Sequence, residues 1–119
     1  MTRVKRSVHA RKKRRETLER TKGFRGEAHS NYRRAKEALM KAESYAYRDR
    51  RNKKRDFRRL WITRINAAAR REGMSYSQLI HGLTLAEIEV DRKMLADVAG
   101  RDPETFRRFA ERAREAAAA

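Results

Sequence analysis

The positive charge of this chain lies almost entirely in its first half. Residues 1–59 contain 23 of the 33 Lys and Arg residues but only 7 of the 16 Asp and Glu residues, a net charge of +16. Residues 60–119 contain the other 10 cations and 9 acids, a net charge of +1. Such a first half repels itself and cannot fold compactly alone unless a polyanion neutralises it. Nucleic acid is the polyanion that best matches this density of cations.

The remaining composition indicates a small protein with one folded core. A chain of 119 residues has room for one domain, or for a small domain with an extension. The large apolar residues are concentrated after residue 60, so the core is expected there. The absence of cysteine excludes disulfides and thiolate metal sites. The apolar runs are too short to cross a bilayer, and the start of the chain lacks the apolar segment of a signal peptide. We therefore expect a soluble intracellular protein without a membrane partner.

Glycine and proline divide the first half into two predicted helices. Neither residue type occurs from Glu27 to Glu72, and strong helix formers fill most of this stretch. We predict one helix over about residues 30–71, roughly 60 Å long at ~1.5 Å per residue. Gly73 suits the left-handed position just after it. A shorter helix is expected over about residues 10–21, before a turn at residues 23–26.

The second half is predicted to form several short helices around a shared core. Ser75 and Gln78 have the spacing of a capping box, and Asp91 is a candidate N-cap for a short helix that Gly100 closes. Thr84 and Glu87 form a competing capping box. Asp102-Pro103 marks the start of the last helix. Apolar residues at helical spacing indicate the core: Leu60, Trp61, Ile65, Ala68, Leu79, Ile80, Leu83, Met94, Leu95, Val98, Phe106, Phe109 and Ala113.

The predicted fold class is therefore all-α. A long basic N-terminal helical extension over residues 1–59 is followed by a small helical globular domain over residues 60–119. Residues 48–59 are polar on every face except at Phe57, and a helix of this kind must bridge, be embedded in a partner, or not form. Pairs such as Asp49 with Lys53 contribute only ~0.2–0.5 kcal/mol each. They cannot offset the repulsion, so we expect the first half to be frayed in the free protein.

Two dense groups of cations indicate phosphate binding. Residues 11–15 are five consecutive cations and residues 48–59 contain eight more, a density that releases condensed counterions from nucleic acid. The aromatic residues of the basic half either stack on unpaired bases or pack on neighbouring aliphatic stems or on another protein: Phe24, Tyr32, Tyr45, Tyr47 and Phe57. Trp61, next to Leu60 and near Ile65, is assigned to the core.

No pattern of catalytic residues is present in the sequence. His9, His29 and His81 lack the spacing of metal ligands. Asp49 and Asp56 lie seven residues apart among arginines, where they are expected to orient guanidinium groups. Gly23 and Gly26 fit a simple turn better than a nucleotide-binding loop. We predict no enzyme activity, no metal and no cofactor.

Charge and pattern together leave few classes of binding protein. A coiled coil is disfavoured because residues 44–59 lack an apolar heptad seam. A membrane-surface helix is disfavoured because the basic half lacks a wide apolar face. A cation-covered helix fits a crevice between RNA helices, where phosphates surround every face. An architectural DNA-binding protein remains the alternative, although a basic helix that continues into a zipper would be typical of that class.

Residues 47–70, YRDRRNKKRDFRRLWITRINAAAR, closely resemble the most distinctive stretch of the bacterial large-subunit ribosomal protein L20 family. Residues 21–26, TKGFRG, are similar to the family's AKGYRG turn, and residues 30–36 and 88–97 also match. The resemblance extends from Arg3 to about Ala113. Two positions depart from the pattern: Ser7 and Glu87 stand where the family often has glycine.

The resemblance implies a structural constituent of the large ribosomal subunit that binds 23S ribosomal RNA early in assembly, beside neighbouring ribosomal proteins. Some members also repress translation by binding their own operon messenger RNA through the globular domain. Carried over position by position, the candidate RNA-binding residues are Arg3, Lys5, Arg6, Arg11, Lys12, Lys13, Arg14, Arg15, Lys22, Phe24, Arg25, Tyr32, Arg33, Arg34, Arg48, Arg50, Arg51, Lys53, Lys54, Arg55, Arg58, Arg59, Arg64, Asn66 and Arg70.

Overall fold

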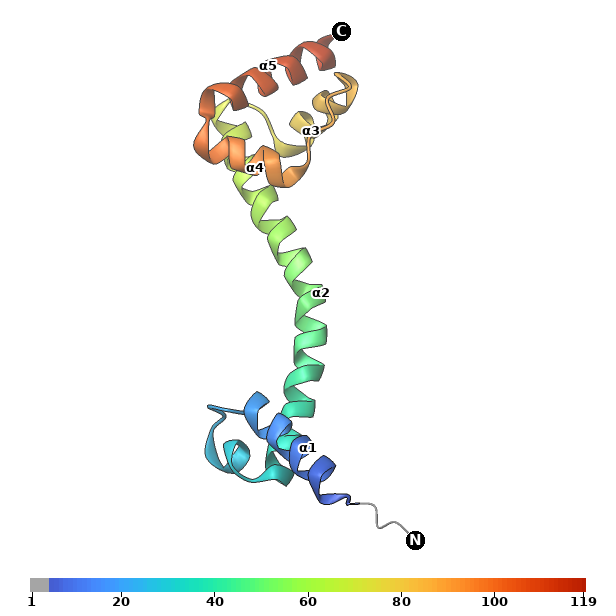
Figure 1. The fold of residues 1–119 in the computed structure, drawn as a ribbon. Helices are drawn as coiled ribbons and strands as arrows, with labels where there is room; N and C mark the ends of the chain where they lie inside the picture. The colour runs from blue at the N-terminus through green and yellow to red at the C-terminus, as the bar shows by residue number, and fades with distance from the viewer. Residues whose placement is uncertain (1–4) are drawn as a thin grey trace. The chain divides into compact units, whose positions relative to one another are not determined.

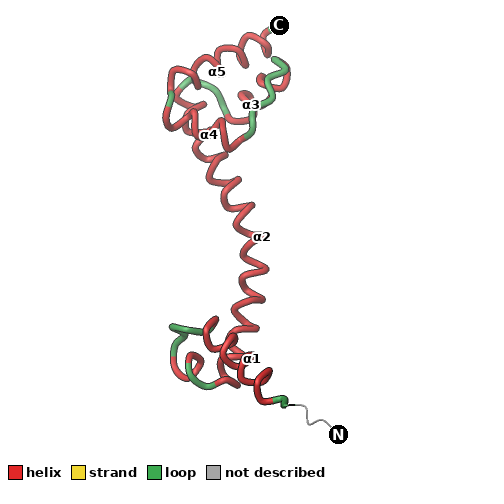
Figure 2. Tube along the Cα trace, viewed as in Figure 1, coloured by secondary structure: helices red, strands yellow, loops and turns green. Residues whose placement is uncertain are grey.

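The structure, a computed structural model, describes residues 5–119, and the regular secondary structure in this range is entirely helical (Figures 1 and 2). The helices are α1 (Ser7–Arg20), a short 3-10 helix η1 (Gly26–His29), α2 (Tyr32–Arg71), α3 (Tyr76–Leu85), α4 (Arg92–Arg101) and α5 (Pro103–Ala118). The all-α prediction is confirmed. The chain divides into two compact units, one up to Arg51 and one from Asn52 to Ala119, and α2 contributes residues to both.

Helix α2 begins two residues later than predicted because Asn31 caps it. The Asn31 Oδ1 atom accepts hydrogen bonds from the backbone N–H groups of Arg33 and Arg34, at 3.1 and 3.5 Å. This satisfies donors that have no partner inside the first turn. At the other end Gly73 has a φ of +74°, as predicted for a residue just after a helix. Helix α1 starts at Ser7, earlier than the predicted residue 10.

The predicted N-terminal caps of the second half are present. The Ser75 Oγ atom accepts from the N–H of Gln78 at 3.3 Å, and Gln78 Oε1 accepts from the N–H of Ser75 at 2.9 Å, which completes the capping box. Asp91 accepts from the N–H of Lys93 and starts α4. Asp102 accepts from the N–H of Thr105 and starts α5, with Pro103 in its first turn.

Two details of the region between α3 and α5 differ from the sequence prediction. The competing capping box does not form, because the Thr84 hydroxyl donates to the carbonyl of Ile80 at 2.9 Å and Glu87 adopts a left-handed φ of 55° beyond the end of α3. Gly100 does not close α4, which continues to Arg101. The last N–H of that region, from Asp102, still bonds to the carbonyl of Val98, so the helical turn is complete without a glycine cap.

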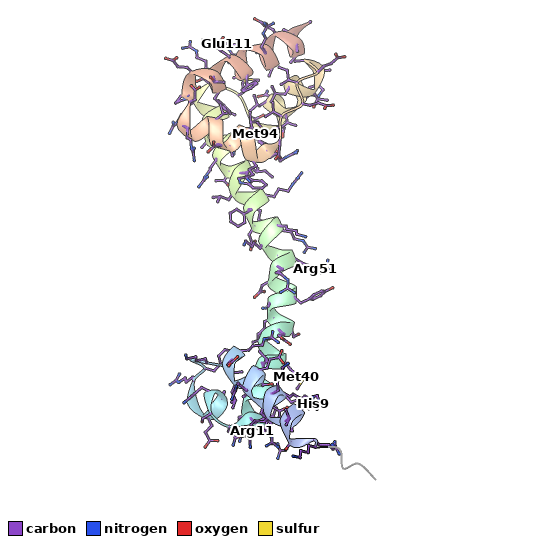
Figure 3. All side chains as sticks on the ribbon, viewed as in Figure 1. His9, Arg11, Met40, Arg51, Met94 and Glu111 are labelled. Atoms are coloured by element: carbon purple, nitrogen blue, oxygen red, sulfur yellow. The ribbon has the colours of Figure 1, made fainter. Side chains whose placement is uncertain are left out.

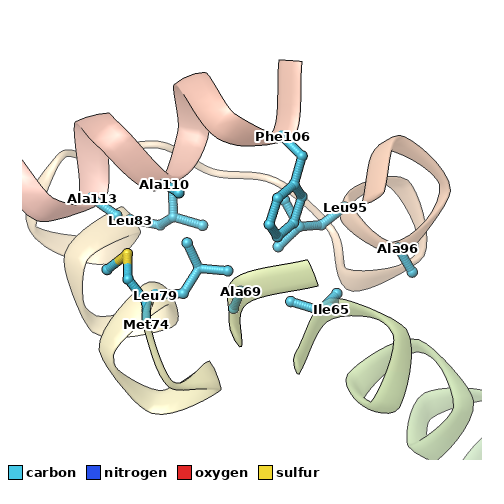
Figure 4. Packing of buried hydrophobic residues seen from close by; sticks show 10 residues of the cluster. All are labelled: Ile65, Ala69, Met74, Leu79, Leu83, Leu95, Ala96, Phe106, Ala110 and Ala113. Atoms are coloured by element: carbon cyan, nitrogen blue, oxygen red, sulfur yellow. The ribbon is translucent and has the colours of Figure 1, made fainter. Parts of the chain in front are cut away.

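The core of the second unit lies where the last turns of α2 meet α3, α4 and α5 (Figure 4). Its buried residues are Ile65, Ala69, Met74, Leu79, Leu83, Leu95, Ala96, Phe106, Ala110 and Ala113. Helices α3 and α5 pack closely because Gly82 faces the backbone of Ala113. A Cβ at Gly82 would stand 2.3 Å from the Ala113 carbonyl oxygen, so only glycine permits this approach.

Three residues assigned to the core lie at its edge or outside it. Met94 is 63% exposed and Leu60 is 42% exposed. Met94 comes one position before Leu95, and α4 buries only Leu95 and Ala96. Trp61 is partly buried against the core and its ring centroid lies 6.2 Å from that of Phe57. The helical spacing was right, but it could not show how narrow the buried face of each helix is.

The first unit buries very little apolar surface. Ala35 and Thr21 are fully buried, and the Thr21 hydroxyl donates to the carbonyl of Thr17 at 3.1 Å. Arg20 and Glu43 form an ion pair between α1 and α2. No residue of α1 itself is buried. The cations of this unit are therefore not needed to cover a core.

Candidate nucleic-acid interface

Residues 43–60 of α2 are all exposed. Figure 3 shows side chains of this helix, Arg51 among them, extending away from the backbone. The stretch carries eight Lys and Arg residues between Arg48 and Arg59. At 3.6 residues per turn their positions fall on most of the helix circumference. A polyanion could therefore be contacted on several faces of α2 at once.

The two acids of this stretch pair with neighbouring arginines. Asp49 Oδ1 lies 3.0 Å from Arg48 Nε, and Asp56 Oδ1 lies 3.9 Å from Arg59 Nη1. The hydrogen bond that Arg48 donates to Asp49 raises the pKa of the Arg48 guanidinium above its ordinary value, and the negative charge of Asp49 adds to the effect. The i,i+4 spacing suggested a pair of Asp49 with Lys53, but Asp49 pairs with the adjacent Arg48 instead. The prediction that both acids orient guanidinium groups is thus consistent with their contacts.

The cations of α1 are exposed along the whole helix. Arg11, Lys12, Lys13, Arg14 and Arg15 all present their side chains to solvent. Arg14 also lies over the ring of Tyr32 at the start of α2, with 5.8 Å between the guanidinium carbon and the ring centroid. The fold therefore brings together candidate residues from two helices. This contact could not be read from the sequence, because it depends on how α1 and α2 are joined.

The join is the turn predicted at residues 23–26. Gly23 and Gly26 both have positive φ values, of 86° and 69°, which favour glycine. The carbonyl oxygen of Phe24 lies 3.1 Å from Nδ1 of His29. Phe24 is partly buried, whereas its neighbours Lys22 and Arg25 are exposed. The turn thus places two cations in solvent and directs the ring of Phe24 partly inward.

Each exposed aromatic ring of α2 lies beside a cation one helical turn away. The guanidinium carbon of Arg48 is 4.8 Å from the ring centroid of Tyr45, and the ammonium of Lys41 is 5.8 Å from it. Arg51 is 4.6 Å from the ring centroid of Tyr47. Such cation–π contacts contribute ~0.5–1 kcal/mol at exposed sites. Neither tyrosine, nor Lys41, was among the candidate residues, although their i,i+3 and i,i+4 spacing was a signal for these contacts.

The other candidate residues are placed as follows. Arg64 and Arg70 are exposed, and Asn66 is partly buried with its Oδ1 3.4 Å from Nε of Arg70. Lys5, Arg6, Arg33 and Arg34 are exposed, and Tyr32 is partly buried. Arg3 lies outside the described residues. None of these contacts tests RNA binding, so the set of 25 residues given above remains a prediction.

Two further observations concern other kinds of site. Within residues 5–119 no three His, Cys, Asp or Glu side chains are grouped closely enough to hold a metal ion. In the same range no helix is both long enough and apolar enough to cross a membrane.

The fold and the exposed cations define a class of protein: all-helical, with a small apolar core in one unit and an exposed, cation-covered stretch of helix. The chain belongs to the ribosomal protein L20 family, because the model of that family matches residues 3–109. This confirms the resemblance found in the sequence. It also makes the chain a ribosomal protein of the large subunit, located in the ribosome in the cytoplasm.

Curated relatives agree over almost the whole chain. The large ribosomal subunit protein bL20 of Rubrobacter xylanophilus is 56% identical over 116 residues, which cover 98% of this chain and 87% of the relative. The protein of the same name from Roseiflexus sp. strain RS-1 is 59% identical over 116 residues, covering 98% of this chain and 99% of the relative. That of Roseiflexus castenholzii is 59% identical over 115 residues, covering 97% and 98%.

Proposed function

We propose that this chain binds 23S ribosomal RNA and promotes an early step in assembly of the large subunit. In this proposal residues 1–59 form the RNA-binding extension and residues 60–119 form the globular domain. The observation that carries it is the exposed stretch of α2, residues 43–60, which holds eight cations and covers no core. A sequence has no folding reason to place so many like charges on one helix. An anionic partner supplies that reason.

The physical mechanism follows from phosphate neutralisation. Each Lys or Arg that contacts a phosphate releases condensed counterions, so affinity falls steeply as salt rises. Cations on several faces of one helix can contact phosphates from more than one RNA strand. RNA helices that otherwise repel can then pack more closely around α2. This would favour compact RNA at an early stage of subunit assembly.

The same observation favours folded RNA over duplex DNA. A helix in the major groove of DNA directs one face to the base edges and leaves its opposite face in solvent. Here Arg48 and Arg59 lie on a different side of α2 from Arg50 and Lys54, because successive residues are rotated by about 100°. A crevice between RNA helices can neutralise all of these charges. Architectural DNA binding is the alternative that the experiment below would reveal.

The family resemblance implies two further kinds of partner, which we include in the proposal. As the resemblance implies, we propose that neighbouring ribosomal proteins contact the chain in the large subunit. We also propose that the globular domain binds the chain's own operon messenger RNA and represses its translation. Both belong to the proposal and rest on the resemblance alone.

The test is the salt dependence of binding by the full chain. Replacing Lys53, Lys54 and Arg55 together by alanine should weaken binding to 23S RNA and reduce the slope of log K against log salt by roughly 2–3, since about one unit is lost per phosphate contact. A matched variant removes Arg101, Arg108 and Arg112 from the second half, where the net charge is only +1. We expect a smaller change of slope for that variant. Equal slopes for wild type and the first variant would contradict the proposal, and equal affinity for duplex DNA would support the architectural alternative.

A further inference from the structure

Tyr47 occupies the most cationic face of the exposed stretch. The residues that follow it at i+3, i+4, i+7 and i+11 are Arg50, Arg51, Lys54 and Arg58. On a helix these spacings lie on one face. The nearest acid on the N-terminal side of that face is Glu43, which is paired with Arg20. The ring is thus surrounded by cations that are available to an anionic partner.

The side chain of Tyr47 is held by one of these cations. Nη2 of Arg51 donates a hydrogen bond to Tyr47 Oη at 2.8 Å, and the guanidinium carbon lies 4.6 Å from the ring centroid. Tyr47 is nevertheless 57% exposed, the largest exposure among the aromatic residues of α2. The contact reduces the freedom of two long side chains and leaves much of the ring open to solvent. A ring fixed in this way loses less entropy when a flat partner stacks on it.

We propose that Tyr47 stacks on an unpaired base of the RNA while Arg51 and its neighbours contact the adjoining phosphates. This inference rests on the proposed function and assigns to α2 a site for an unpaired nucleobase in addition to its phosphate contacts. Every base has a π face, so an exposed ring among cations binds single-stranded nucleotides with little dependence on sequence. Such bases occur in the loops and bulges of folded RNA.

Tyr45 supplies the contrast that makes this inference specific. It lies two residues away, is 46% exposed and also contacts an arginine, Arg48. At the same spacings it is followed by Arg48, Asp49, Asn52 and Asp56, so two carboxylates lie on its face of the helix. Those carboxylates pair with Arg48 and Arg59, so they reduce the positive charge that this face offers to a sugar–phosphate backbone. Tyr45 is therefore expected to contribute little to RNA binding, although its residue type and exposure resemble those of Tyr47.

The experiment compares the full-length variants Tyr47→Leu and Tyr45→Leu for binding to a 23S RNA transcript across a potassium chloride series. Leucine keeps an apolar side chain and a high helix propensity but has no ring. We expect Tyr47→Leu to raise Kd about 5- to 100-fold, as loss of one base stack does, with no change in the salt slope. Tyr45→Leu should change Kd less than about twofold. Tyr47→Phe should keep most of the affinity because it retains the ring.

Photo-crosslinking of the wild-type complex followed by mass spectrometry gives a direct readout, and a nucleotide adduct is expected on Tyr47. Equal effects of the two leucine variants would overturn the inference, as would an adduct on Tyr45 alone. So would a Tyr47→Leu variant whose salt slope falls as it does in Arg51→Ala, because Tyr47 would then act only by positioning Arg51. The variant that replaces Lys53, Lys54 and Arg55 by alanine separates failure of the base-stacking inference from failure of the proposed RNA binding. If its slope is reduced while Tyr47→Leu binds like wild type, the base site is wrong and phosphate binding stands.

Discussion

Glu87 is a residue whose backbone suits glycine better than its own side chain. Its φ of 55° lies in the left-handed region, just beyond the end of α3. The N–H of Ile88 bonds to the carbonyl of Leu83 at 3.0 Å and that of Glu87 to the carbonyl of Thr84 at 3.2 Å. These two bonds define a Schellman motif, which usually has glycine at this position. The motif also explains why Ile88 packs back against the core near Leu83.

Replacing Glu87 by glycine should therefore stabilise the folded chain. Relief of the left-handed strain is worth ~1–3 kcal/mol, and the greater freedom of glycine in the unfolded chain offsets roughly 0.5–1 kcal/mol of it. We expect a net gain of about 0.5–2 kcal/mol in the free energy of unfolding, measured by urea denaturation. Glu89→Gly is the matched control, because the φ of Glu89 is not positive. A gain from Glu89→Gly equal to that from Glu87→Gly would show that the left-handed backbone is not the cause.

Asp102 links stability to pH at the start of α5. Hydrogen bonds from the hydroxyl and the N–H of Thr105 lower the pKa of the Asp102 carboxyl below its ordinary value. A lowered folded pKa means that the contribution to stability is present above the unfolded pKa and is lost as pH falls through the folded one. Wild type should thus lose stability below about pH 4. Asp102→Asn keeps a capping oxygen but does not titrate, so its melting temperature should fall less over the same range. Parallel losses in the two proteins would contradict this assignment.

At the scale of helices, two glycines test how closely α3, α4 and α5 pack. Gly82→Ala would place its Cβ against the backbone of Ala113 in α5, so the helices must separate, which should cost at least 1–3 kcal/mol. Gly100 also lies inside a helix, but a Cβ there meets nothing within 4 Å. Gly100→Ala should therefore stabilise the chain by ~0.5–1 kcal/mol through helix propensity. Thermal unfolding of both variants decides the matter, and a Gly82→Ala protein as stable as wild type would exclude the close approach of α3 and α5.

The helices themselves were largely predictable because their ends carry local chemistry. Ser75 with Gln78, Asp91, Asp102-Pro103 and Gly73 all act where the sequence placed them. The errors arose where a helix end depends on less obvious groups, as at Asn31, or where a glycine lies inside a helix, as at Gly100. Local propensity indicates which residues are able to cap or end a helix. Packing against other helices decides whether it does.

The candidate interface was predictable in outline because charge density can be read directly from the sequence. Charge density alone selects residues 48–59, and the structure leaves that stretch exposed. The contacts of Arg14 with Tyr32 and of Arg51 with Tyr47 could not be derived, because each depends on side-chain conformation or on the turn that joins two helices. Sequence therefore identified which residues carry charge but not which of them are held in place before a partner arrives.

At the scale of the whole molecule, charge and apolar packing are separated along the chain. The buried cluster draws on residues from Ile65 to Ala113, whereas the net charge of +16 lies in residues 1–59. Formation of the buried cluster thus does not require neutralisation of the cations in residues 1–59. Residues 43–60 have neither buried contacts nor balanced charge to hold their helical conformation. Their helicity rests on intrinsic propensity and on exposed side-chain contacts one turn apart, such as that of Arg51 with Tyr47.

Hydrogen exchange should therefore distinguish the two parts of α2 in the free protein. We expect the amides of residues 43–60 to exchange rapidly at low salt and to become protected when 23S RNA is added, because neutralised cations no longer repel one another. The amides around Leu79 and Phe106 should be protected in both conditions, since they lie in the buried cluster.

The variant Arg50→Glu offers a further check on the role of charge repulsion. It removes one cation and places an acid four residues before Lys54, a pair that supports a helix by ~0.2–0.5 kcal/mol. This variant should protect the stretch without RNA while weakening RNA binding. If residues 43–60 of the wild type were as protected at low salt as the core helices, repulsion among the cations would not govern the conformation of this helix.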